Sequence, residues 1–193
     1  MRSRADGVRV AYPLFQVDGD GSKPISALDM RFEVIDRQTM EDLNREWHSR
    51  LPEFRTACKC RVYYGAECGG LWYAVAAWSH PVARLLPQSW MELRRLAIAD
   101  DAPKNTATRM LGWMVRDIKK RFPDVERLIS YQDTEVHTGC IYAGAGWKKT
   151  KRSEGDEWNR PNRFRDVVQS SAPKQRWELE ITRQAIKMTE VKS

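Results

Sequence analysis

The stretch that decides the fold covers residues 91–147 and reads MELRRLAIADDAPKNTATRMLGWMVRDIKKRFPDVERLISYQDTEVHTGCIYAGAGW. Residues 91–99 alternate in a β-rich pattern that predicts a strand. Residues 108–121 carry apolar side chains at helical spacing, which predicts a helix. A second strand at 127–131 and a second short helix at 135–145 follow. Because strand, helix, strand and helix alternate over so short a length, we expect a parallel pair of strands joined by a right-handed crossover.

The residues before this stretch predict further strands and one more helix. Residues 30–35 have the composition of a short strand. Residues 38–49 place Met40, Leu43 and Trp47 on one face of a helix, which Asp36 can cap. A β-hairpin is expected around the turn at Cys68-Gly69-Gly70, with strands at 60–67 and 71–79. We therefore expect an α/β fold with a central mixed sheet and helices on both faces.

The composition indicates one domain with tails. At 193 residues, 41% hydrophobic and 31% charged, the chain can bury a substantial core. No apolar run reaches membrane-spanning length, and the first residues lack the apolar core of a signal peptide. We therefore expect a cytoplasmic protein without a membrane partner. The expected organisation is an N-terminal extension at 1–29, a catalytic domain at 30–150 and a basic C-terminal arm at 151–193.

The charge balance favours a polyanionic partner. The formal net charge is +7, and such a balance is typical of proteins that bind nucleic acid or phosphorylated cofactors. Cations interleaved with aromatic side chains suit DNA, because the cations bind phosphates and the rings stack on bases. A solvated tail is the alternative explanation for such a composition. The candidate DNA-binding residues are Lys148, Lys149, Lys151, Arg152, Trp158, Arg160, Arg163 and Arg165.

The element order and the residues of the central stretch resemble the GNAT family of N-acetyltransferases. The strand LRRLAIA at 93–99 leads into a loop at 100–107, and IYAGAGW at 141–147 matches the family's later signature. In that family, amides at a helix N-terminus hold the pyrophosphate of acyl-CoA, and a tyrosine protonates the departing thiolate. The free amides and the helix dipole make such a site attractive to anions. The resemblance assigns cofactor binding to Leu96, Ile98, Lys104, Asn105, Thr106 and Arg109.

The loop at 100–107 departs from the family pattern. It contains no glycine, whereas glycine normally lets the backbone approach a phosphate closely. Asp100 and Asp101 also bring negative charge to this place. Lys104, Arg109 and the amides of 105–107 can still form an anion site. Acyl-CoA is therefore an open question as the group donor.

A narrower resemblance connects the chain with phage and prophage proteins of a GNAT-like fold. It rests on NREWHS at 44–49, ELRR at 92–95, SYQDT at 130–134 and the pair Ile141-Tyr142. Among these proteins are the Mom-type DNA modification proteins, which add a carbamoylmethyl group to the exocyclic amine of adenine and so protect phage DNA from restriction. Members have been proposed to hold iron through His, Tyr and Asp side chains. The resemblance implies a Mom-type transferase that acts on double-stranded DNA, with iron as a candidate cofactor.

The resemblance nominates His48, Asp133, Tyr142, Arg94 and Ser130 as catalytic residues, with His48 and Asp133 as metal ligands. Each has a structural alternative. A histidine at a helix end can simply interact with the dipole, an aspartate can cap the next helix, and a tyrosine can pack in the core. The sequence does not decide which arginine of the 94–95 pair faces the site.

Three functions remain open at this stage. The first is adenine modification in DNA, which requires base flipping and an aromatic stacking platform, for which Trp47, Trp90 and Trp158 are candidates. The second is N-acetyl transfer from acyl-CoA to a protein or small amine. The third is a non-enzymatic antirestriction protein that only binds DNA. The oligomeric state is also open, a homodimer included.

Overall fold

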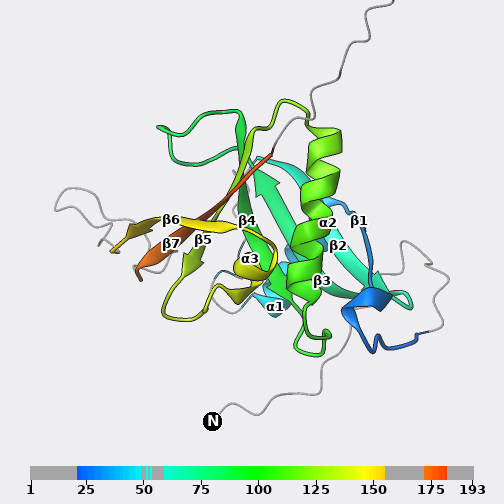
Figure 1. Cartoon of the computed structure of the whole chain (residues 1–193). Helices are drawn as coiled ribbons and strands as arrows, with labels where there is room; N and C mark the ends of the chain where they lie inside the picture. Colours follow the sequence, from blue (N-terminus) through cyan, green and yellow to red (C-terminus); the bar gives the residue numbers. More distant parts are fainter. Residues whose placement is uncertain (1–20, 49–50, 52, 54–58, 155–171, 182–193) are drawn as a thin grey trace, which may run out of the picture.

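The computed structural model describes residues 21–48, 51, 53, 59–154 and 172–181 (Figure 1). The strands of this part form one sheet in the order β1-β2-β3-β4-β5-β7-β6. The pairing of β4 with β5 is parallel, and every other pairing is antiparallel. The expected mixed sheet is thus confirmed. Its strands are β1 (Arg31–Val34), β2 (Cys60–Cys68), β3 (Leu71–Ser79), β4 (Trp90–Ile98), β5 (Arg127–Asp133), β6 (Lys148–Ser153) and β7 (Lys174–Glu180).

Helices cover both faces of the sheet, as the sequence predicts. Helix α1 (Arg37–Trp47) packs on β2, β3 and β4 from one side. Helix α2 (Thr106–Arg121) crosses the other face, where it contacts β4 and the short helix α3 (Cys140–Gly144) (Figure 1). A short 3-10 helix, η1 (Ala27–Asp29), precedes β1. No helix in the described part of the chain has the length and apolar character that a membrane crossing requires.

The helices begin and pack where local chemistry directs them. Asp36 caps α1, because its carboxylate accepts the backbone N–H of Thr39 at 2.9 Å. Met40 and Leu43 of α1 are buried against β3 and β4 in a small core. On the other side, α2 contributes its apolar face to a larger core that includes α3. Its four fully buried side chains, at the spacing predicted from the sequence, are Met110, Leu111, Met114 and Ile118.

The predicted helix at 135–145 is wrong in its first half. The helix spans only Cys140–Gly144, and a turn precedes it. The cause is Gly139, whose φ of 78° is left-handed and breaks the helical path. A side chain there would also collide with its neighbours, since a Cβ would lie 2.4 Å from Oε1 of Gln132 and 2.5 Å from the Trp177 ring.

The region expected to be a surface arm contributes two strands to the sheet. Strand β7 pairs with β5 over its whole length, and β6 pairs with the outer side of β7. Trp177 of β7 is buried in the larger core, so these two strands belong to the fold rather than to an appendage. Within the expected arm at 151–193, the described residues thus include the whole strand Lys174–Glu180.

Candidate active site

The two central strands separate partway along their length. The parallel pairing joins residues 90–93 of β4 to residues 127–130 of β5 and ends there, although β4 continues to Ile98 and β5 to Asp133. In α/β folds, ligands gather at the carboxyl ends of parallel strands. The point of separation, at Leu93 and Ser130, is therefore where a substrate or cofactor can reach side chains from both strands.

A buried pair of hydroxyl groups lies at this point. Ser130 Oγ and Tyr142 Oη are 2.8 Å apart, and both residues are buried. The Tyr142 ring stacks on Trp177 at 5.4 Å between centroids and tilts toward Trp147 at 5.7 Å. Burial raises the pKa of Tyr142 above its ordinary value, and the bond to Ser130 opposes this effect only in part. The phenol therefore keeps its proton at neutral pH and can act as a proton donor.

A bulge in β4 settles how the adjacent arginines are arranged. Trp78 of β3 pairs with Leu93, and Ala77 pairs with Arg95, so Arg94 is the extra residue on β4. The guanidinium of Arg94 binds the buried carboxylate of Glu92 at 2.5 Å. Arg95 lies opposite Ala77, which belongs to the core under α1, and so points to the α1 side. The bulge thus pairs Arg94 within its own strand and turns Arg95 toward His48.

His48 caps the end of helix α1 and lies near Arg95. Its backbone N–H donates to the carbonyl of Asn44 at 2.9 Å, as expected of a residue that caps the helix end. Burial, with smaller contributions from the nearby Arg95 and His137, lowers the pKa of His48 to about 4. The imidazole is therefore neutral at neutral pH. Sequence reasoning missed Arg95 and His137 as neighbours, because residues this far apart in the chain meet only through the fold.

The hydrogen bonds of His48 assign its tautomer. Nδ1 accepts the backbone N–H of Leu51 at 3.2 Å. In a neutral imidazole one ring nitrogen accepts and the other carries the hydrogen. Nε2 of His48 is therefore a donor while this bond is kept. A donor at this place can hold a carbonyl oxygen or a ring nitrogen of a substrate, and it does not act as a base.

Asp133 ends β5 and organises the turn that follows. Its Oδ1 accepts the backbone N–H of Glu135 at 3.0 Å, and its carbonyl accepts that of His137 at 3.1 Å. The sequence analysis gave capping of the next helix as the structural alternative for Asp133. In the structure Asp133 caps a turn instead. Side chains alternate along a strand, and Ser130 faces α3, so Asp133 faces the α1 side. Asp133 and His48 therefore lie on one face of the sheet near the point where β4 and β5 separate. Tyr142 lies near the same point on the other face.

The described residues do not fit the iron site that the sequence resemblance implies. Among them no three His, Cys, Asp or Glu side chains gather in a way that could hold a metal ion. Tyr142, the candidate catalytic tyrosine, is buried with its hydroxyl bonded to Ser130. Nδ1 of His48 is bonded to the backbone. We therefore derive no chemical step through a metal.

The start of α2, where the sequence predicts an anion site, has no side-chain cap. Asn105 precedes the helix with a φ of 69° and makes no side-chain cap. Asn is among the few residues other than glycine that tolerate this conformation. The Thr106 hydroxyl donates to the carbonyl of Pro103 at 2.8 Å, which fixes the loop. Of the expected cofactor residues, Lys104, Asn105 and Arg109 are exposed here, while Leu96 and Ile98 are partly buried against the larger core.

The expected DNA-binding residues fall in two groups. Trp158, Arg160, Arg163 and Arg165 lie outside the described residues. The other four belong to the edge strand β6, in which every side chain is exposed. The ammonium of Lys149 lies 5.3 Å from the centre of the Trp177 ring. The exposed cations on this edge are Lys148, Lys149, Lys151 and Arg152.

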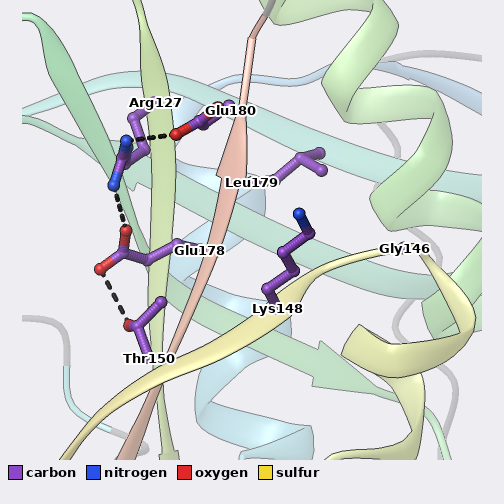
Figure 2. Close-up of a pocket in the computed structure, with 7 residues that line it drawn as sticks. All are labelled: Arg127, Gly146, Lys148, Thr150, Glu178, Leu179 and Glu180. Carbon is purple, nitrogen blue, oxygen red and sulfur yellow. Dashed lines mark hydrogen bonds and ion pairs between the residues drawn. The ribbon is translucent and has the colours of Figure 1, made fainter.

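A depression of about 260 Å³ lies between the ends of β5, β7 and β6 (Figure 2). Arg127 spans its wall by binding the carboxylates of Glu178 and Glu180, each at 2.5 Å. Thr150 donates a further hydrogen bond to Glu178 at 2.9 Å. Since Arg127 begins β5, the depression is at the opposite end of that strand from Asp133. Its ion pairs stabilise the sheet edge, and it is separate from the candidate active site.

The fold is that of the GNAT acetyltransferases. The structure is similar to a *Bacillus subtilis* acetyltransferase in complex with CoA, with a TM-score of 0.54 and 14% identity over 79% of this chain and 99% of that one. It is also similar to the ribosomal-protein-S18-alanine N-acetyltransferase of *Escherichia coli*, with a TM-score of 0.53 and 13% identity over 82% and 98%. A third similar structure is the ribosomal-protein-S5-alanine acetyltransferase of *Vibrio fischeri*, with a TM-score of 0.57 and 7% identity over 79% and 93%.

Within this fold the family can be named. The Mom protein family matches residues 29–189, which include both strands of the C-terminal region. This chain belongs to the Mom protein family. The comparison with curated proteins gave no match.

Proposed function

We propose that this protein is a transferase of the Mom type that modifies the exocyclic amine of adenine in DNA. Such a modification would protect phage or prophage DNA from restriction in the cytoplasm of a bacterial host. The observation that carries the proposal is the hydroxyl pair of Ser130 and Tyr142 at the separation of β4 and β5, in a chain of the Mom family. The pair supplies a proton donor where the fold admits a ligand between two strands.

Each candidate residue takes a role that its geometry allows. The amine nitrogen of adenine forms a bond to an electrophilic carbon of the group donor, while the bond from that carbon to the leaving group breaks. The leaving group departs with the electron pair of that bond and takes a proton from Tyr142. Asp133, a carboxylate at the end of β5, accepts the proton that the amine loses. Nε2–H of His48 donates a hydrogen bond that orients the substrate. An aromatic amine is a poor nucleophile, so positioning by these groups contributes much of the rate.

The edge strand β6 supports binding of the DNA backbone. Lys148, Lys149, Lys151 and Arg152 are all exposed on it, and lysine and arginine bind phosphates with a strong dependence on salt. A duplex hides the exocyclic amine of adenine in the base stack. The enzyme must therefore extrude the base before it can react.

A second candidate function is acyl transfer from acyl-CoA to an amine of a protein or small molecule. The observation that favours it is the start of α2. There Asn105 takes the left-handed conformation that glycine usually provides, so the loop has this conformation although it contains no glycine. The similar *Bacillus subtilis* acetyltransferase was solved in complex with CoA. Calorimetry with acetyl-CoA tests this reading. Micromolar binding that is lost in Asn105→Val supports it, because a β-branched residue is strained at positive φ.

Mass spectrometry of nucleosides from cells that express the protein tests the main proposal. We expect a heavier derivative of deoxyadenosine in place of part of the normal peak. Tyr142→Phe removes the proton donor and keeps the stacked ring, so we expect at least a roughly 100-fold loss of product. His80→Gln changes an exposed histidine near the start of β4 and serves as the control. Unaltered deoxyadenosine in the presence of folded wild-type protein contradicts the proposal.

A further inference from the structure

Tyr131 is an exposed aromatic side chain in the middle of the sheet. It is 37% exposed, although its neighbours on β5, Ser130 and Gln132, are buried. Since side chains alternate along a strand and Ser130 faces α3, Tyr131 faces the α1 side. Helix α1 packs on β2, β3 and β4 and leaves the ring uncovered. A large ring held by a rigid central strand and open to solvent presents a flat apolar surface to a ligand.

The position of Tyr131 connects it with the candidate active site. It is the first residue of β5 beyond the pairing with β4, which ends at Ser130. On the same face, β4 presents Arg95, whose positive charge acts on His48. Asp133 follows two residues later on that face, about 7 Å along the strand. A planar group that rests on Tyr131 therefore lies on the face of the sheet that also carries Asp133 and Arg95.

The charges around this face suit a nucleotide. Arg176 lies opposite Tyr131 on β7, where it binds the carboxylate of Glu178 at 2.7 Å. Arg95 donates hydrogen bonds to the carbonyls of Arg94 and Glu53. The exposed cations of β6 lie at the outer edge of the same half of the sheet. A flat ring flanked by cations binds a base by stacking and its phosphates by charge.

The tryptophans expected to stack on the base are placed differently. Trp47 packs against the core under α1. Trp90 is at the start of β4, with the guanidinium of Arg127 4.7 Å from its ring centre. It is thus at the opposite end of the strand from the separation. Trp158 lies outside the described residues.

We propose that Tyr131 is the platform on which the target adenine stacks after it leaves the duplex. This inference rests on the proposed function, since it assigns a binding surface to the same reaction. Stacking on a protein ring tolerates any base, so the Tyr131 ring supplies affinity and orientation. Asp133 then accepts a hydrogen bond from the exocyclic amine, and Nε2–H of His48 donates to a ring nitrogen of the adenine. The phenol hydroxyl of Tyr131 has no part in this role.

The test measures how much one base contributes to binding. Fluorescence anisotropy measures the affinity for two duplexes. One carries a single adenine opposite an abasic site, and the other carries abasic sites at both of these positions. We expect wild-type protein to bind the adenine duplex more tightly. Tyr131→Leu should lower that advantage by about tenfold, because it keeps bulk but removes the aromatic face. Tyr131→Phe should keep the advantage. Leu85→Ala, which removes another exposed apolar side chain in the β3–β4 connection, is the control.

A spectroscopic signature distinguishes stacking from mere loss of contact. With 2-aminopurine in place of adenine, wild-type protein and Tyr131→Phe should keep the fluorescence quenched, and Tyr131→Leu should raise it. The inference is overturned if Tyr131→Leu keeps the full preference for the adenine duplex. It is also overturned if Tyr131→Phe loses as much of this preference as Tyr131→Leu does. If wild-type protein binds neither duplex, the proposed DNA function itself fails and the inference fails with it. Melting temperatures of all variants confirm that they are folded.

Discussion

Strand β5 turns Ser130 toward a buried aromatic layer and Tyr131 toward an open, charged face of the sheet. On the buried side, Ser130 binds Tyr142, and Trp177 donates from its indole N–H to Gln132 at 2.6 Å. The amide of Gln132 in turn donates to the carbonyl of His137. On the open side, the pKa of His48 is lowered first by burial and then by the charge of Arg95.

The difference shows how one strand can serve two tasks. The buried side fixes the hydroxyl pair and the turn after β5, since close-packed side chains leave little freedom. The open side keeps polar groups accessible, and so it can accept a substrate. The rigid side thus determines where the reactive groups of the open side lie. Apart from the proton donor Tyr142, changes on the buried side should act mainly on stability, whereas changes on the open side should act mainly on titration and binding.

The largest effect is expected from Gly139, which closes the buried side. Gly139→Ala forces a side chain into a left-handed residue and against Gln132 and Trp177. We expect a loss of about 3 kcal/mol in the free energy of unfolding, the sum of the backbone and overpacking costs. Urea denaturation measures it.

The matched control for this change is Gly146→Ala. Gly146 has nearly the same φ, 79°, but a Cβ there would meet no atom within 4 Å. Only the backbone cost of about 1 kcal/mol should remain. Equal losses in the two variants would show that the contact of Gly139 with Gln132 and Trp177 does not constrain the turn.

A smaller effect is expected from His48 on the open side. Its pKa of about 4 in the folded protein is below the value of about 6.5 in the unfolded chain. The unfolded state therefore binds the proton first as the pH falls from 6.5 to 4, and this destabilises the folded state across that window. Between pH 6.5 and 4 the wild-type protein should lose on the order of 1–2 kcal/mol of its free energy of unfolding through this group, and His48→Gln should not show this loss. The value is smaller than the full pKa difference would give, because the ring is partly solvated.

Denaturation of wild-type protein and His48→Gln at several pH values checks this sign. Above pH 6.5 the difference between the two should be constant, because the imidazole is neutral in both states. His80→Gln, on the exposed connection after β3, serves as the reference variant. A parallel pH dependence in wild-type protein and His48→Gln would show that burial and Arg95 do not lower the pKa of the imidazole in the folded protein.

Much of the fold follows from local patterns in the sequence. The apolar period of residues 108–121 and the turn at Cys68-Gly69-Gly70 identify α2 and the β2–β3 hairpin, because both elements are decided by neighbours in the chain. Strand β7 could not be placed this way. Its pairing with β5 joins residues more than 40 positions apart, such as Ser130 and Trp177. Such a pairing is stabilised only when the sheet has formed.

The candidate site also contains residues that the sequence could identify and arrangements that it could not. Tyr142 and Ser130 could be nominated from the sequence, because motif resemblance selects residues by type and spacing. The arrangement of Arg94 and Arg95 could not, because a bulge breaks the alternation on which the facing argument depends. The neighbourhood of His48 with Arg95 and His137 depends on three separate elements. Such a meeting leaves no local signal in the chain.

The smallest effect on stability is expected at the sheet edge, where the buried layer meets the basic strand. Lys149 places its ammonium over the Trp177 ring, and it is exposed. Lys149→Ala should cost only about 0.5 kcal/mol in the free energy of unfolding, as for a solvated cation–π contact. If β6 binds the DNA backbone, the same change should reduce the salt dependence of DNA affinity by about one phosphate contact. Lys119→Ala removes the same charge from the exposed end of α2. An equal change in both variants would mean that net charge, rather than strand β6, governs binding.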